Sequence, residues 1–196
     1  MITVITARGI SERLGNNMLT NVTKHLDPKR FRVRELEYTA AYGNVGGNEA
    51  FGISQATGRN TLLAMIDQDP YPVVLLGFSA GAKLMGDVAA EIADGKHPHL
   101  EVRGVGLIAD PARHGGQIVG QNREGHGITG QRWISTAIFP VWQFSAPGDP
   151  ISELPEGNPL RTFADLTEFW GPDQGRWMQE LAERARQRQW QRWWDL

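Results

Sequence analysis

Apolar and polar residues along this chain follow two alternating patterns, one typical of β-strands and the other of α-helices. Short apolar runs or period-two alternation mark five predicted strands: residues 2–6, 31–38, 72–77, 102–109 and 141–145. Apolar residues three and four apart mark three predicted helices between them: residues 18–26, 49–67 and 82–93. Because strands and helices alternate, we expect an α/β fold with a mainly parallel central sheet and right-handed crossovers.

The C-terminal part of the chain has a different composition. Residues 161–170 and 173–194 have helical spacing, and five of the seven tryptophans lie there, interleaved with arginines. We therefore expect two parts: a core over residues 1–160 and a Trp- and Arg-rich helical segment over residues 161–196.

Trp190, Trp193 and Trp194 form the end of an apolar stripe on this segment, at spacing i, i+3 and i+4. Tryptophans and arginines are enriched at the energetic centres of protein interfaces, and a chain terminus is rarely ordered unless something holds it. We predict an interface with a protein partner or with a second copy of the chain. Packing on the chain's own sheet and adsorption to a membrane surface are the alternatives.

The sequence Gly77-Phe78-Ser79-Ala80-Gly81 fits the pattern G-x-S-x-G, between an apolar strand and a helix. In that context the pattern predicts a nucleophile elbow, a tight turn that projects the serine hydroxyl above the sheet. The glycines let neighbouring backbone pass close by, and the N-terminus of the following helix stabilises developing negative charge. A Gly- and Ser-rich turn without a chemical role is the alternative.

Several segments over residues 2–151 resemble, in consistent order, the cutinases and the lysin B esterases of actinobacteriophages. The segments that carry the resemblance are Ala7–Gly9, Tyr38–Gly43, Gly77–Asp87, Ile108–Arg113 and Ala146–Ile151. The resemblance implies a three-layer α/β-hydrolase fold and a serine esterase without a cofactor or a metal. It also places Arg8, Tyr38, Tyr42 and Arg113 near the cleft, where we expect the two tyrosines to have packing roles.

Residue by residue, the resemblance implies that Ser79 is the nucleophile and that Asp149 is the acid of the catalytic triad. It also implies an oxyanion hole formed by the amide of Ala80 and by a second donor from the loop of Ile10 and Ser11. Ile10 stands where the family often has threonine or serine. Because Gly-Asp-Pro is also favourable turn chemistry, a purely structural role stays open for Asp149.

A triad serine needs a base, which in α/β-hydrolases is a histidine that follows the acid in the chain. None of the five histidines of this sequence follows Asp149: they are His25, His97, His99, His114 and His126. The first three are expected at the edge of the sheet away from Ser79. His114 and His126 follow the strand predicted over residues 102–109, so their loop opens at the edge where Ser79 lies. Either is a candidate substitute base, and a surface-loop role is the alternative.

Two functions are compatible with these features. The absent late histidine and the Trp-rich segment favour a virion-associated protein of an actinobacteriophage, a tail or capsid accessory protein that reuses the hydrolase fold without turnover. Ser79 and Asp149 favour an active serine esterase that cleaves lipid esters of the mycobacterial-type cell envelope. The first hypothesis predicts a protein partner or self-assembly, and the second predicts a cell-envelope lipid ester as substrate.

Composition narrows the partners and the location. There are 20 Lys and Arg against 22 Asp and Glu, and no basic run, so we expect no nucleic-acid partner. There is no cysteine, and the N-terminus runs into a strand without a charged leader or a long apolar stretch. We therefore expect a protein without a signal peptide or a transmembrane segment, made in the host cytoplasm. From there it would reach the virion or be released at lysis to the cell envelope.

Overall fold

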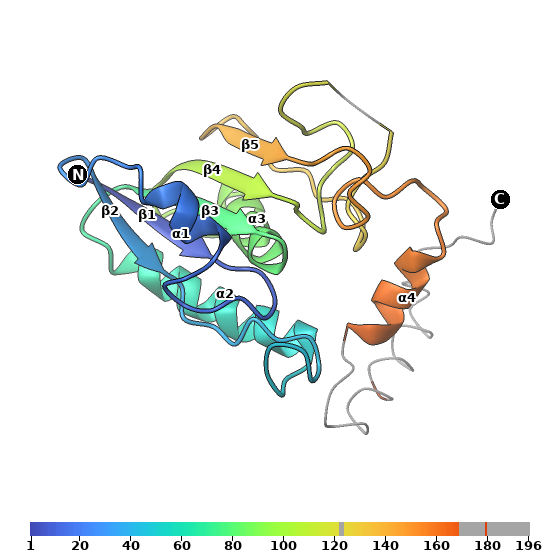
Figure 1. Ribbon diagram of the computed structural model, residues 1–196. Helices are drawn as coiled ribbons and strands as arrows, with labels where there is room; N and C mark the ends of the chain where they lie inside the picture. The colour runs from blue at the N-terminus through green and yellow to red at the C-terminus, as the bar shows by residue number, and fades with distance from the viewer. Residues whose placement is uncertain (122–123, 169–178, 180–196) are drawn as a thin grey trace.

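A computed structural model describes residues 1–121, 124–168 and 179 (Figure 1). The strands are β1 (Ile2–Ala7), β2 (Phe31–Glu35), β3 (Val73–Phe78), β4 (Val102–Ile108) and β5 (Val141–Phe144). They form one parallel sheet in the order β2-β1-β3-β4-β5, so β3, which leads to Ser79, is the central strand. The helices are α1 (Met18–Thr23), α2 (Phe51–Asp67), α3 (Ala80–Ala93) and α4 (Leu160–Thr167).

Helices cover both faces of the sheet, which confirms the predicted three-layer α/β arrangement (Figure 1). α2 and α3 lie against each other on one face, and α1 lies on the other. No helix in the described part of the chain is long and apolar enough to cross a membrane. The predicted interface residues Trp190, Trp193 and Trp194 lie outside the described residues, and the division of the chain at residue 160 stays a prediction.

The core forms because the central strands are apolar on both faces. Ile5, Leu75 and Val105 are fully buried and lie in register across β1, β3 and β4. Burying one such side chain contributes about 1.5–3 kcal/mol to the free energy of unfolding. This packing aligns the carboxyl ends of the three strands at one edge of the sheet, where ligand sites of open α/β sheets lie.

Candidate active site

Ser79 lies in the turn between β3 and α3, at the carboxyl edge of the sheet. Its backbone has φ 53° and ψ −120°, a conformation that costs a residue other than glycine on the order of 1–3 kcal/mol. The Ser79 amide donates to the carbonyl of Ile108 (2.9 Å), and the Ser79 carbonyl accepts from the amide of Lys83 (3.1 Å). These bonds hold Ser79 in the strained turn that the sequence motif predicts.

The hydroxyl of Ser79 does not cap helix α3. A serine at the N-cap of a helix usually accepts a hydrogen bond from an amide of the first turn. Ser79 is the N-cap residue of α3 and makes no such bond. Its hydroxyl has no hydrogen-bond partner within the described part of the chain, so it is available to a ligand.

Both glycines of the motif are required by close backbone contacts. A Cβ at Gly77 would lie 2.5 Å from the Cα of Ala82, and a Cβ at Gly81 would overlap the carbonyl group of Ala7. Side-chain carbons do not approach backbone atoms so closely, so α3 packs against β1 and β3 only with glycine at both positions.

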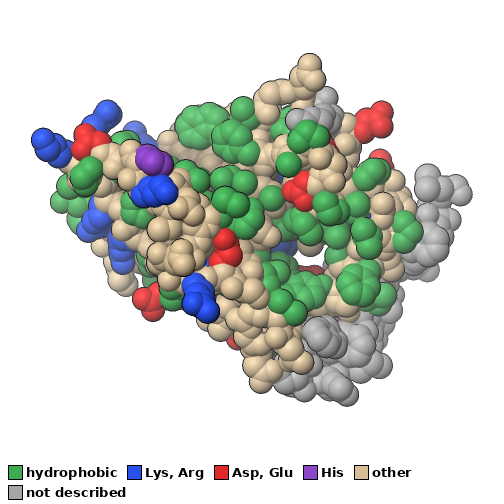
Figure 2. Space-filling model, in the orientation of Figure 1, with side chains coloured by type: hydrophobic (Ala, Val, Ile, Leu, Met, Phe, Trp, Pro, Cys, Tyr) green, Lys and Arg blue, Asp and Glu red, His purple; other side chains and the backbone are tan. Residues whose placement is uncertain are grey.

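A cavity of about 230 Å³ opens beside Ser79. Its predominantly apolar lining consists of Ile10, Tyr42, Phe51, Ser79, Ala80, Pro111, Ile128, Thr129, Ile151, Phe163, Ala164 and Glu168. Figure 2 shows hydrophobic side chains around a hollow between the core of the molecule and α4. Such a lining suits the hydrocarbon part of a ligand. Most of these residues are not predictable from the sequence as cavity lining, because an apolar residue in a loop or at a helix end carries no signal that separates a cavity wall from ordinary packing.

Three backbone amides of cavity-lining residues have no acceptor among the described residues: those of Ile10, Phe51 and Ala80. Ala80 is the first residue of α3, where amides lack a partner within the helix and carry the positive end of the helix dipole. The amide of Ser11 instead donates to the carbonyl of Ala40 (3.2 Å), and Ser11 does not line the cavity. The geometry favours Ile10 over Ser11 as the second donor of an oxyanion hole.

Arg8 and Tyr38 fix the loop that carries Ile10. The Arg8 guanidinium donates to the carbonyls of Tyr38 (2.6 Å) and Glu12 (2.8 Å), and the Tyr38 hydroxyl donates to the carbonyl of Arg8 (2.5 Å). The Glu12 carboxylate accepts from the amide of Gly9 (2.7 Å). Burial raises the pKa of Tyr38 well above its ordinary value, so its hydroxyl stays a donor at neutral pH. Tyr38 thus has the expected structural role.

Asp149 lies in the turn after β5, at the same edge of the sheet as Ser79. Its carboxylate accepts hydrogen bonds from the amide of Ile151 (3.0 Å) and the hydroxyl of Ser152 (2.5 Å). Ile151 lines the cavity, whereas Asp149 does not. The position agrees with the family resemblance and the contacts stabilise the turn, so the triad role of Asp149 stays a prediction.

His114 follows β4 but makes contacts away from Ser79. Its Nδ1 accepts a hydrogen bond from the amide of Gly116 (3.0 Å). The ring packs edge-on against Trp133, with 5.1 Å between ring centroids. His114 does not line the cavity, so the structure supplies no contact through which it would act on Ser79.

His126 is also engaged elsewhere. Its Nδ1 donates to the carbonyl of Gly127 (3.0 Å), and the residue does not line the cavity. Burial, together with the positive charge of Arg161, lowers the pKa of His126, so its ring is neutral at pH 7. His97 pairs with Glu91 (2.9 Å) near the C-terminal end of α3, at the edge opposite to Ser79, as expected.

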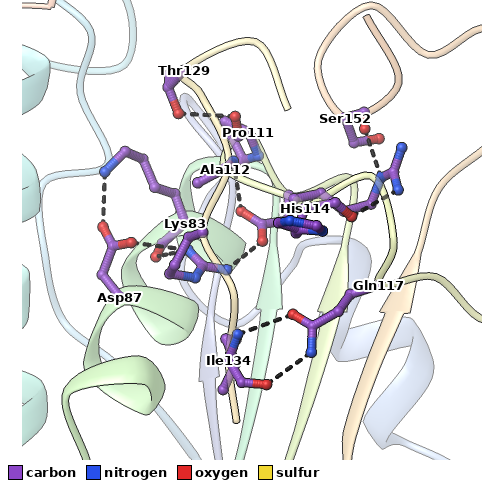
Figure 3. Close-up of polar contacts among 12 residues, drawn as sticks. Lys83, Asp87, Pro111, Ala112, His114, Gln117, Thr129, Ile134 and Ser152 are labelled. Carbon is purple, nitrogen blue, oxygen red and sulfur yellow. Dashed lines mark hydrogen bonds and ion pairs between the residues drawn. The ribbon is translucent and has the colours of Figure 1, made fainter. Parts of the chain in front are cut away.

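A partly buried ionic network supports the loop after β4 (Figure 3). The guanidinium of Arg132 contacts the carboxylates of Asp87 (2.9 Å) and Asp110, and Lys83 pairs with Asp87 (2.7 Å). Burial alone would raise the pKa of Asp87, but the charges of Lys83 and Arg132 outweigh it and lower that pKa. None of these residues lines the cavity, so the network joins α3 to the loop without entering the site.

Arg113, which the resemblance places near the cleft, is fully buried. Its guanidinium donates to the carbonyls of Ser152 (2.7 Å) and Gly125 (2.9 Å). These bonds link the loop after β4 to the turn that contains Asp149. Arg113 therefore holds together two loops beside the cavity and does not line the cavity itself.

No group of three or more potential metal-ligating side chains occurs among the described residues.

A parallel three-layer sandwich with a strained serine between its central strand and the next helix defines an α/β-hydrolase fold. Comparison with solved structures shows which α/β-hydrolases this fold resembles. Lysin B from mycobacteriophage D29 aligns with a TM-score of 0.64 at 19% identity, over 84% of this chain and 73% of that one. A cutinase-like protein from Cryptococcus sp. aligns with a TM-score of 0.59 at 20% identity, over 92% of this chain and 91% of that one.

An acetylxylan esterase aligns with a TM-score of 0.59 at 19% identity, over 92% of this chain and 95% of that one. No protein-family model matches the sequence, and no curated protein sequence matches it. At these identities the likeness establishes the fold, which is that of the cutinase-like α/β-hydrolases.

Proposed function

We propose that this protein carries the ester site of a cutinase-like serine esterase, with Ser79 as the nucleophile. One observation carries the proposal: the strained turn presents a hydroxyl that has no partner among the described residues, beside an apolar cavity. Strained backbone persists only where the surrounding structure imposes it, and it clusters at active sites. Here Gly77 and Gly81 allow the close packing that imposes it.

In the proposed reaction the oxygen of Ser79 attacks the ester carbonyl carbon. The carbonyl oxygen takes up negative charge and accepts hydrogen bonds from the amides of Ala80 and Ile10. The C–O bond to the alcohol then breaks, the alcohol leaves with the proton that the Ser79 hydroxyl gives up, and the acyl group remains on Ser79. Water attacks this acyl group, the bond to Ser79 breaks, one proton of the water returns to the Ser79 oxygen, and the acid is released. Asp149 is the proposed triad acid, which would orient the group that carries these protons.

A second function is favoured by a separate observation. Neither His114 nor His126 lines the cavity, and each ring is held by contacts elsewhere. Without a base, loss of turnover is on the order of 10⁶ relative to a complete triad. The same site would then bind lipid esters without cleaving them, in a virion-associated protein of an actinobacteriophage that uses the fold for assembly or host attachment.

Labelling by a fluorophosphonate tests the first function, since this reagent reacts with activated serines. The chain of 196 residues is incubated with the reagent, and the adduct is located by mass spectrometry. The expected result is one adduct at Ser79, absent in Ser79→Ala, together with release of nitrophenol from p-nitrophenyl esters. An unlabelled Ser79 in a folded chain that still binds long-chain alcohols contradicts the esterase and supports the binding function.

A further inference from the structure

α4 supplies the part of the cavity wall that lies outside the sandwich of sheet and helices. Phe163 and Ala164 of this helix, and Glu168 directly after it, line the cavity together with Ser79. In Figure 1, α4 stands beyond the carboxyl ends of the strands. The cavity is therefore closed on one side by an element that contributes no side chain to the hydrophobic core.

The N-terminal end of α4 is fixed by Arg161, whose side chain is nearly fully buried. Its guanidinium donates to the carbonyls of Gly127, Leu154 (2.5 Å) and His126 (3.3 Å). These carbonyls belong to two loops, the one after β4 and the one after β5. Each bond is made by a charged donor, so the set holds this end firmly.

The C-terminal end of α4 is fixed to the start of α2. The hydroxyl of Thr167 hydrogen-bonds to that of Tyr42, and the carbonyl of Glu168 accepts from the amide of Gly52 (3.0 Å). Tyr42 lines the cavity and packs against Phe51, with 5.4 Å between ring centroids. With both ends tied, the middle of α4 stays over the cavity.

The middle of α4 presents one small and one large apolar side chain to the cavity. Ala164 leaves space, whereas Phe163 is 61% exposed although it belongs to the lining. An exposed aromatic ring beside an apolar cavity is a surface that a hydrocarbon chain would cover. The two residues thus have different effects. The small side chain of Ala164 leaves volume in the cavity, and the ring of Phe163 extends the apolar surface from the cavity toward the solvent.

We propose that α4 determines the length of the acyl chain that the site accepts, with Ala164 and Phe163 as the specificity-determining residues. The proposal deepens the proposed function, because that function places the ester carbonyl at Ser79 and its acyl chain in the cavity. A cavity of about 230 Å³ holds far more than an acetyl group, since one water occupies about 30 Å³ of liquid. The ligand class is an unbranched acyl chain of medium or greater length.

The test measures binding of n-alkanols from hexanol to decanol to the full chain by isothermal titration calorimetry. These neutral ligands need no catalysis and avoid charge repulsion by Glu168. Each added CH₂ is expected to lower the Kd about fourfold until the cavity is full. In Ala164→Trp the gain is expected to stop at a shorter chain than in the wild type. In Phe163→Ala, which changes an exposed side chain, decanol is expected to bind several-fold more weakly, with a smaller loss for hexanol.

Leu160→Trp is the matched control, because Leu160 is an exposed residue of α4 that does not line the cavity. It is expected to leave the Kd series unchanged. Identical series for the wild type, Ala164→Trp and Phe163→Ala would overturn the proposal, as would failure of the folded wild type to bind any alkanol. Length-dependent binding without labelling of Ser79 would reject the esterase and retain the role of α4.

Discussion

Gly81 of α3 packs directly against the carbonyl group of Ala7 at the end of β1, with no space between them for a Cβ. This contact joins the two halves of the candidate site. Ala80 precedes Gly81 in the chain and Ile10 lies three residues after Ala7, so the contact brings the amides of Ala80 and Ile10 to one cavity. The distance between the proposed oxyanion donors therefore depends on the absence of a side chain at Gly81.

Replacing Gly81 by alanine is expected to destabilise the protein, because the new Cβ would overlap the Ala7 carbonyl. Overpacking of this kind costs about 1–3 kcal/mol or more, which lowers the Tm of a chain of this size by about 2–4 °C per kcal/mol. Gly116→Ala is the control, since a Cβ there meets His114 only at 3.4 Å. Equal thermal melts for the two variants would show that α3 is not held against β1 in this way.

The strained backbone at Ser79 predicts that two substitutions of this residue differ in their effect on stability. Glycine adopts φ 53° without the cost that a Cβ imposes, so Ser79→Gly is expected to be more stable than Ser79→Ala by about 1 kcal/mol. Both variants lose the nucleophile and are expected to lose fluorophosphonate labelling. Chemical denaturation of the two variants measures the difference. A less stable glycine variant would mean that the turn is relaxed in solution.

Arg132 is expected to be among the most sensitive residues outside the cavity. Arg132→Met leaves the carboxylates of Asp87 and Asp110 without this cation. Asp110 is buried, and breaking a buried pair in this way costs about 3–5 kcal/mol. Arg103→Met removes an exposed partner of Glu101 and is expected to cost no more than about 1 kcal/mol. Urea unfolding of both variants checks the contrast, and similar midpoints would contradict it.

The sequence predicts the architecture well because the signals are local and repeated. Each predicted strand within residues 1–160 is present, from Ile2–Ala7 to Val141–Phe144, since continuous apolar runs are typical of buried parallel strands. Ser79 is predictable for the same reason: its motif lies in one continuous stretch that contains the strand, the turn and the start of the helix. The choice between Ile10 and Ser11 was not, because it depends on which amide a distant carbonyl, that of Ala40, takes up.

The sequence also does not predict that α4 forms a wall of the cavity. Helical spacing over residues 161–170 predicts the helix, and α4 is present at Leu160–Thr167. Its position depends on Arg161, a charged residue that ordinarily lies at the surface. Only the structure places its guanidinium among the carbonyls of Gly127, Leu154 and His126.

His126 predicts how the stability of this region depends on pH. Burial and the charge of Arg161 lower its pKa in the folded protein, whereas the unfolded chain has the ordinary value of about 6.5. As the pH falls, the unfolded chain therefore binds the proton first, and the free energy of unfolding decreases. The stabilising contribution is present above pH 7 and is lost as the pH falls through 6.5 toward the lower folded value. Because the ring is partly exposed to solvent, the effect is expected to be small.

His126→Asn is expected to flatten the dependence of Tm on pH between 7.5 and 5.5, a range that lies above the ordinary pKa values of Asp and Glu. The physical reasons are the burial of the ring and the positive charge of Arg161, whose guanidinium donates to the same Gly127 carbonyl as the ring of His126. A protonated ring would thus add a second positive charge where the guanidinium already lies. Titration of the His126 ring by NMR shows directly whether its pKa in the folded protein lies below or above 6.5. A ring that titrates above 6.5, or an unchanged slope in His126→Asn, would mean that Arg161 does not hold α4 at this loop in solution.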